Sequence, residues 1–132
     1  MILITGATGF VGRALCASMS VRSSLRIAVR DKAVGKWPKG IDVIQASLSA
    51  DHDWISALSG VSAVIHCAAR LHVMNEQAAD PLAEFRQVNV DGTLRLARQA
   101  AEAKVRRFVF LSSIKVSGEQ SQLGHPFTAD QP

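Results

Sequence analysis

The sequence predicts an α/β protein with a doubly wound parallel sheet of about five strands in the order 3-2-1-4-5. Short apolar runs alternate along the chain with longer amphipathic segments, which is typical of repeated strand–helix units with right-handed crossovers. The first run, residues 1–5, is apolar and ends at a glycine, as expected of a central strand covered on both faces. In such a sheet, ligands bind at the carboxyl ends of the strands.

The first half of the chain contains three of the predicted strands. A helix over 9–20 follows the first strand, and polar residues 21–24 end it. Strands follow at 25–30 and 41–46, separated by a turn-rich stretch. Acidic and hydroxyl side chains at 49–53 then open a short helix. The predicted core positions of the two helices are Val11, Ala14, Leu15, Ser18, Met19, Trp54, Ile55 and Leu58.

The second half supplies the other two strands, at 63–67 and 107–111. Between them, a loop over 69–79 leads to Pro81, a favourable first-turn residue, and to a long helix ending near Lys104. Residues 118–132 are polar and loop-like, within a single domain over 1–132. The predicted buried stripe of the long helix is Leu82, Phe85, Val88, Leu96 and Ala100.

Composition narrows the function classes. The chain has 132 residues, 48% hydrophobic and 20% charged, the usual balance of a globular domain rather than a disordered or fibrous protein. Cys16 and Cys67 are too few for a disulfide framework, so we expect a reduced, cytoplasmic protein. No apolar run approaches the ~18 residues of a membrane span, and no basic segment precedes the apolar start as in a signal peptide.

The net charge of +4 does not indicate a nucleic-acid partner. Basic residues are spread along the chain with acids between them, and aromatic residues are few. The scattered histidines His52, His72 and His125 have no paired acid at a recognisable spacing, so we expect no metal site and no nucleophile triad.

The segment TGATGFVG at 5–12 is the strongest local signal for function. It lies directly after the first strand and directly before the first helix, where glycines allow a sharp turn, close approach of a pyrophosphate, and helix–strand packing. The phosphates would face unpaired amides at the positive end of the helix. The sequence therefore predicts a dinucleotide site of the Rossmann type. The predicted contacts here are Gly6, Thr8, Gly9, Phe10, Val11 and Gly12.

Position 30 bears on which dinucleotide binds. The tip of the second strand meets the adenosine ribose, where an acid favours NAD and an arginine pairs with the 2′-phosphate of NADP. Arg30 occupies this tip and Asp31 follows it, so NAD or NADP is expected and Arg30 favours NADP. Ser47 and Leu48, after the third strand, are predicted to border the adenine.

Four motifs in order resemble the extended short-chain dehydrogenase/reductase family, in its nucleotide-sugar epimerase and dehydratase branch. They are the glycine segment, HCAA at 66–69, NVDGT at 89–93 and LSSIKVSG at 111–118, and they cover essentially the whole chain. The end of the chain, including GHPF at 124–127, looks like the UDP-glucose 4-epimerase-like isomerases of bacterial surface-polysaccharide synthesis.

The resemblance implies roles for further residues. Ser113 aligns with the family's catalytic serine, and Asn89 with a residue that supports the loops on the cofactor side. His66 is predicted from its surroundings to be a packed core histidine rather than an acid or a ligand. The remaining implied cofactor contacts lie in the second and fourth motifs, and they are Cys67, Ala68, Ala69 and Ser112.

One departure from the family pattern affects the predicted activity. The family's proton-transfer group is a tyrosine in Tyr-x-x-x-Lys, and this chain contains no tyrosine. We therefore expect the N-terminal, NAD(P)-binding part of a nucleotide-sugar epimerase, catalytically incomplete, with the C-terminal substrate portion absent. Two alternatives stay open: a non-catalytic module that senses NAD(P) or binds a partner, and an NADPH-dependent reductase of the dihydroflavonol-reductase type.

The expected partners follow from the same hypothesis. The parent protein would bind a nucleotide sugar, and a homo-oligomer is expected. The fifth strand should have an open edge and apolar faces, which predicts self-association of the chain by itself.

Overall fold

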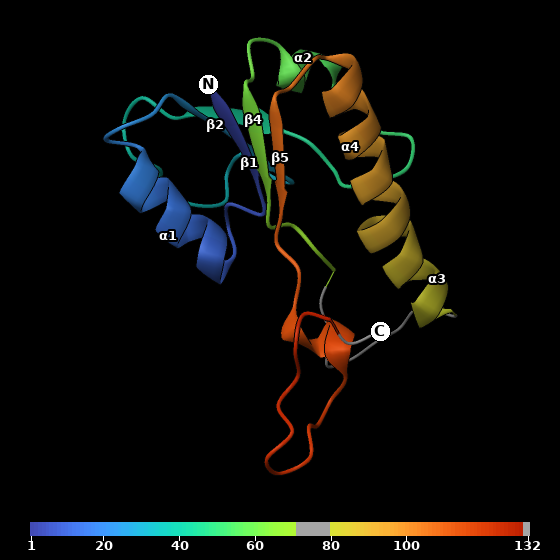
Figure 1. The fold of residues 1–132 in the computed structure, drawn as a ribbon. Coiled ribbons are helices and arrows are strands. Elements are labelled where there is room, and N and C mark those ends of the chain that lie inside the picture. The colour runs from blue at the N-terminus through green and yellow to red at the C-terminus, as the bar shows by residue number, and fades with distance from the viewer. Residues whose placement is uncertain (71–79, 131–132) are drawn as a thin grey trace.

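The computed structural model describes residues 1–70 and 80–130, and it contains one five-stranded sheet (Figure 1). The order is β3-β2-β1-β4-β5 and every pair is parallel, so the predicted topology is confirmed. All five strands therefore end at the same edge, which we call the carboxyl edge. The strands are β1 (Ile2–Thr5), β2 (Leu25–Val29), β3 (Asp42–Gln45), β4 (Ala63–His66) and β5 (Arg107–Phe110).

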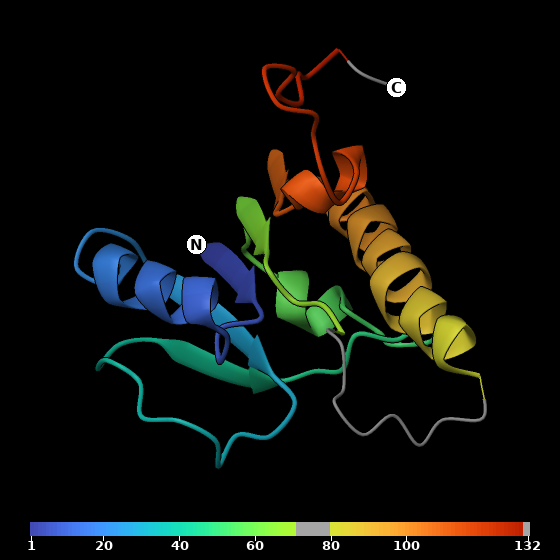
Figure 2. The ribbon, with the colours of Figure 1, turned by 90° about the horizontal axis from the view of Figure 1, so that it is seen from below.

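Helices cover both faces of the sheet. Figures 1 and 2 show α1 (Phe10–Met19) on one face and the long helical segment over 81–102 on the other. The short helix α2 (Ile55–Leu58) lies near the C-terminal end of this segment. The core is divided in the same way, with one apolar cluster around Ile4 and Cys16 and another around Leu3, Trp54 and Leu96. The sheet is thus apolar on both sides, as the unbroken apolar strands predict.

The buried face of α1 differs from the predicted one. Gly12 and Cys16 are buried, whereas Val11, Ala14 and Ser18 are exposed. Relative to the prediction, α1 is rotated about its axis, because Gly12 has no side chain and lets the helix approach the loop after β1. The side of α1 that packs on the sheet therefore includes Gly12 and, one turn later, Cys16. The predicted stripe is therefore wrong at three positions, although Leu15 and Met19 are half-buried and pack against the core.

The long helical segment is continuous, but it is not one regular α-helix as predicted. It consists of α3 (Pro81–Arg86), a π-helical stretch η1 (Gln87–Gly92) and α4 (Thr93–Glu102). Figure 1 shows α3 reaching past the carboxyl edge of the sheet, and Leu82 there is 58% exposed rather than part of the core. Ile55 is also wrongly predicted, at 68% exposed, because the single turn of α2 turns Ala57 and Leu58 inward instead.

The C-terminal region carries little regular structure. A short 3-10 helix, η2 (Ile114–Ser117), follows β5, and an isolated β-bridge joins Gln122 and His125 farther along the chain. Within the described ranges, no helix combines the length and apolar character needed to cross a membrane. The predicted loop over 69–79 and His72 fall mostly or wholly outside the described residues.

A candidate dinucleotide-binding cleft

A cleft of about 540 Å³ opens at the carboxyl edge of the sheet, between β1, β2, β3 and β4. Its walls come from the loops that follow these four strands, which is where a doubly wound sheet binds ligands. Nine predicted contacts line it: Gly6, Thr8, Gly9, Arg30, Ser47, Leu48, Cys67, Ala68 and Ala69. Seven further lining residues were not predicted: Thr5, Ala28, Val29, Ala46, Trp54, Arg70 and Val88.

The glycine loop is held tightly between β4 and α1. Gly6 has φ +72°, and a Cβ there would lie 2.6 Å from the carbonyl carbon of Cys67, so both conformation and space require glycine. A Cβ on Gly12 would lie 2.1 Å from the carbonyl oxygen of Gly6. Gly9 N donates to that same oxygen at 3.0 Å, closing the turn. Two of the three glycines therefore let backbone segments touch, as their spacing predicts.

The first turn of α1 offers unpaired backbone donors. No side chain caps this end among the described residues, and its first turn holds no acid. Helix α3 is different, because Asp80 accepts there from Ala83 N at 3.0 Å. The first amides of a helix have no intrahelical partner and carry partial positive charge. The amides of Phe10, Val11 and Gly12 therefore suit an anion such as a pyrophosphate, and the residues present fit a dinucleotide.

The tip of β2 presents a cation to the cleft. Arg30 lines the cleft and its backbone oxygen accepts from Gln45 Nε2 at 3.1 Å. The carboxylate of Asp31 is engaged elsewhere, accepting from Ala33 N at 2.8 Å in a turn. Of the two charged neighbours, the arginine is therefore the one at the cleft.

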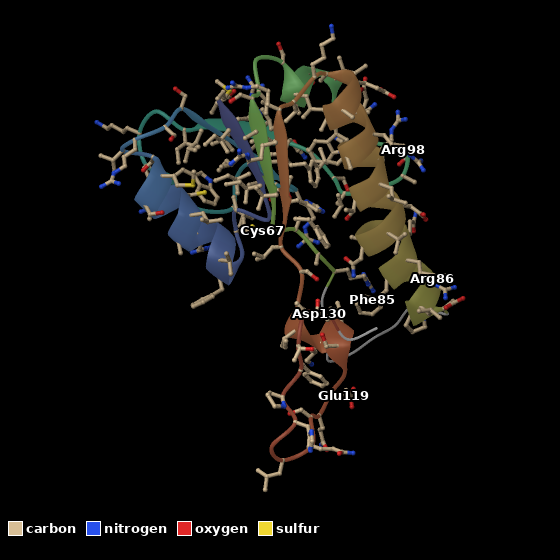
Figure 3. The ribbon with its side chains drawn as sticks, viewed as in Figure 1. Cys67, Phe85, Arg86, Arg98, Glu119 and Asp130 are labelled. Atoms are coloured by element: carbon tan, nitrogen blue, oxygen red, sulfur yellow. The ribbon has the colours of Figure 1, made fainter. Side chains whose placement is uncertain are left out.

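The loop after β4 is anchored to the π-helical stretch. Asn89 Oδ1 accepts from Arg70 N at 2.7 Å, and its Nδ2 donates to Arg70 O at 3.0 Å. Arg70 Cζ lies 5.6 Å from the centre of the Phe85 ring, and its Nη1 lies 3.9 Å from a carboxylate oxygen of Glu84. Figure 3 shows Phe85 on the side of the helical segment that faces the rest of the fold and Arg98 on its outer side. Asn89 thus orders a cleft wall without lining it.

His66 is buried at the end of β4, as predicted for a packed core histidine. Its Nδ1 lies 2.5 Å from Thr5 Oγ1 and its Nε2 2.9 Å from Thr93 Oγ1. Burial lowers the pKa of His66 to about 4, so the imidazole is neutral at neutral pH. Cys67 follows His66 and lies at the carboxyl edge in Figure 3. Burial raises the pKa of its thiol, so the thiol is protonated at neutral pH.

Six predicted site residues do not line the cleft: Phe10, Val11, Gly12, Asn89, Ser112 and Ser113. The first three present backbone amides beside it, and Asn89 acts through Arg70. Ser113 follows β5, and its Oγ accepts from Lys115 N at 3.2 Å as the cap of η2. Ser112 and Ser113 are exposed.

The missed residues had weak sequence signals. Trp54 and Val88 were recognised as apolar, but only the tertiary packing shows that they also face the cleft. Arg70 directly follows the small residues Ala68 and Ala69, and its position after β4 was the available signal. The titratable residues in the described cleft lining are Arg30, Cys67 and Arg70. Residues 1–70 and 80–130 contain no cluster of three or more potential metal ligands.

Comparisons with known proteins agree with this geometry. The model of the NAD dependent epimerase/dehydratase family matches residues 2–132. A UDP-glucose 4-epimerase from Vibrio cholerae is 44% identical over 131 residues, which are 98% of this chain and 39% of that protein. The human 3 beta-hydroxysteroid dehydrogenase type 7 is 28% identical over 95% of this chain and 35% of its own length.

Solved structures show the same fold. A short-chain dehydrogenase/reductase superfamily protein from Agrobacterium tumefaciens with bound NAD is 36% identical, with a TM-score of 0.81, and is matched over 100% of this chain and 38% of its own. The UDP-N-acetylglucosamine 4-epimerase from Bacillus cereus, at 22% identity and a TM-score of 0.74, shares the fold over 99% of this chain and 46% of its own. The chain thus spans less than half the length of each of these relatives. By the family match over nearly all of its length, the chain belongs to the NAD dependent epimerase/dehydratase family.

Proposed function

We propose that this chain is the dinucleotide-binding part of a nucleotide-sugar epimerase of the UDP-glucose 4-epimerase type. The observation that carries the proposal is the uncapped first turn of α1, whose free amides lie beside the cleft behind the Gly6 turn. The 44% identity to the Vibrio cholerae UDP-glucose 4-epimerase supports this choice within the family.

The preferred cofactor is NADP, with NAD as the alternative. Arg30 at the cleft supports NADP, because a guanidinium pairs with a 2′-phosphate and the nearby carboxylate of Asp31 is turned to Ala33. The bound NAD in the Agrobacterium tumefaciens relative supports NAD. Neither requires a change in the glycine loop, since both carry the same pyrophosphate.

The proposed reaction uses groups from more than this segment. A bound nicotinamide supplies hydride transfer to and from the sugar. The Ser113 hydroxyl would donate its hydrogen to the reacting oxygen of the sugar, while its oxygen accepts from Lys115 N as it does here. The 132 residues contain no tyrosine to move the proton. We therefore expect binding without turnover from this chain alone, and catalysis from a longer protein with a Tyr-x-x-x-Lys motif.

A backbone-donor substitution tests the binding proposal. Phe10→Pro removes one amide donor at the first helical position, where proline is tolerated, and Gly9 before it is extended as proline requires. Loss of one charge-assisted hydrogen bond should weaken NAD⁺ and NADP⁺ binding about tenfold by calorimetry. The matched control is Phe10→Ala, which keeps the amide and removes only a side chain that is 94% exposed. Equal affinity of the two variants, or no binding by the unmodified chain, would refute the proposal.

Two alternatives make different predictions. A reductase of the same family, favoured by Arg30, would with its complete chain oxidise NADPH stoichiometrically, whereas an epimerase returns the hydride and accumulates no oxidised cofactor. A non-catalytic sensor would have no in-frame Tyr-x-x-x-Lys in the coding sequence about 15–30 residues after Pro132. Sequencing that region, and assaying the complete protein with UDP-glucose for epimerised product and for oxidised cofactor, distinguishes the epimerase, the reductase and the sensor.

A further inference from the structure

His66 connects two parts of the fold that are far apart in sequence. It ends β4, and its ring lies between Thr5, which ends β1, and Thr93, which begins α4. Both ring nitrogens have a hydroxyl partner, and the side chain is fully buried. A buried ring with both nitrogens partnered is fixed in position as well as in orientation.

This line of contacts reaches the wall of the cleft. Thr5 Oγ1 also accepts from Ala68 N at 3.4 Å, and Thr5 and Ala68 both line the cleft. Thr5 directly precedes Gly6, so its position sets where the glycine loop starts. Thr93, at the other end, is not part of the cleft lining. A continuous series of contacts therefore runs from the cleft wall through His66 to the start of α4.

One arrangement of hydrogens satisfies the three side chains. A neutral imidazole has one donor and one acceptor nitrogen. Because Thr5 Oγ1 accepts from Ala68 N, its own hydrogen is available for His66 Nδ1, which then accepts. In this tautomer Nε2 carries the ring hydrogen and would donate it to Thr93 Oγ1, which lies 2.9 Å away.

Packing alone does not require this residue. The ring contacts Phe108 and Phe110, with ring centres 6.0 and 5.8 Å away, and an aliphatic or phenyl side chain would fill such a place. What the imidazole adds is the pair of polar contacts to Thr5 and Thr93.

We infer that His66 is a positioning residue of the dinucleotide site, which holds the loops after β1 and β4 in place by linking them to Thr93 on α4. This inference rests on the proposed dinucleotide function, and it adds a role for residues that do not touch the ligand. It implies that changing Thr93, outside the cleft, alters binding inside it.

A pair of substitutions at Thr93 tests this. Thr93→Val keeps the shape and removes the hydroxyl, whereas Thr93→Ser keeps the hydroxyl. Thr93→Val should weaken the preferred dinucleotide about fivefold by calorimetry, and Thr93→Ser should restore affinity to within about twofold. A destabilising control is Leu25→Ala, a buried position at the amino end of β2, which should lower stability without changing affinity.

A second readout needs no ligand. Amide hydrogen exchange at Ala68 should be about fivefold faster in Thr93→Val than in the unmodified chain or in Thr93→Ser. If the unmodified chain binds no dinucleotide, the proposed function fails and the exchange data still decide the positioning role. Unchanged affinity together with unchanged exchange in Thr93→Val would overturn the inference and leave the proposed function intact.

Discussion

Gly92 lies directly against Leu48: a Cβ on Gly92 would be 2.9 Å from both the carbonyl carbon and the Cγ of Leu48. Gly92 ends the π-helical stretch, and Leu48 lines the cleft after β3. Asn89 also holds Arg70, which follows β4. The helical segment therefore contacts two loops of the cleft, the one after β3 through Gly92 and the one after β4 through Asn89. A π-helical turn inside an α-helix is frequently found at functional sites, and here it carries both contacts.

Gly92→Ala should destabilise the chain although alanine is the better helix former. Helix propensity favours alanine by about 1 kcal/mol, but an added methyl would press on the Leu48 backbone, and such overpacking costs about 1–3 kcal/mol. We expect a net loss of about 1 kcal/mol in urea unfolding and weaker dinucleotide binding. Asp91→Ala, at an exposed position of the same stretch, should not destabilise. A more stable Gly92→Ala variant would contradict the close contact.

Asn89→Leu should lower the free energy of unfolding more than the half-buried position of Asn89 suggests. The change leaves both the N–H and the C=O of Arg70 without the amide that now pairs with them. Losing two partly buried hydrogen bonds costs about 0.5–1.5 kcal/mol each, so we expect a loss of about 2 kcal/mol in unfolding free energy. Gln87→Leu, exposed in the same stretch, is the control. Equal stability of the two variants would show that the Asn89 contacts contribute little.

The sequence predicted those features that depend on local pattern. Apolar runs and the glycine spacing were sufficient for the strand order, the Gly6 turn and the close packing at Gly12. The π-helical stretch was not predicted, because Gln87–Gly92 fits an ordinary helical pattern and its geometry is determined by tertiary contacts. Trp54 was expected in the core, and nothing local shows that it also reaches the cleft.

Arg30 should determine cofactor preference. Arg30→Ala is expected to weaken NADP⁺ binding at least about tenfold, the effect of losing a charge-assisted contact with the 2′-phosphate. NAD⁺ affinity should change little, because NAD⁺ lacks that phosphate. Calorimetric titration of both nucleotides measures the ratio, and Lys32→Ala is the control for a general change in charge. If the ratio of NADP⁺ to NAD⁺ affinity is unchanged in Arg30→Ala, the arginine does not contact the 2′-phosphate, and NAD becomes the preferred cofactor of the proposal.

Stability should fall on mild acidification because of His66. The pKa of a histidine is about 6.5 in the unfolded chain, and burial lowers the pKa of His66 to about 4 in the folded one. Between these values the unfolded state binds the additional proton, so the His66 contribution is fully present above about pH 6.5 and is lost as pH falls toward 4. The loss should reach about 3 kcal/mol. In His66→Gln this part of the pH dependence should disappear. Identical pH profiles of the variant and the unmodified chain would exclude His66 as the cause.

The edge strand β5 should make the 132-residue chain self-associate. Strand β5 pairs only with β4 in the described sheet, and Val109, Phe110 and Leu111 are 42%, 55% and 47% exposed. Such an apolar edge offers unpaired backbone groups to another chain, whereas β3, the other edge, carries the polar ends Asp42 and Gln45. Val109→Lys places a charge at the β5 edge and should weaken association about tenfold in sedimentation equilibrium, which corresponds to about 1.4 kcal/mol. Val34→Lys introduces the same charge on an exposed loop and should leave association unchanged. If the unmodified chain sediments as a monomer at high concentration, the open edge is not an association site, and the expected homo-oligomer would have to form through another surface.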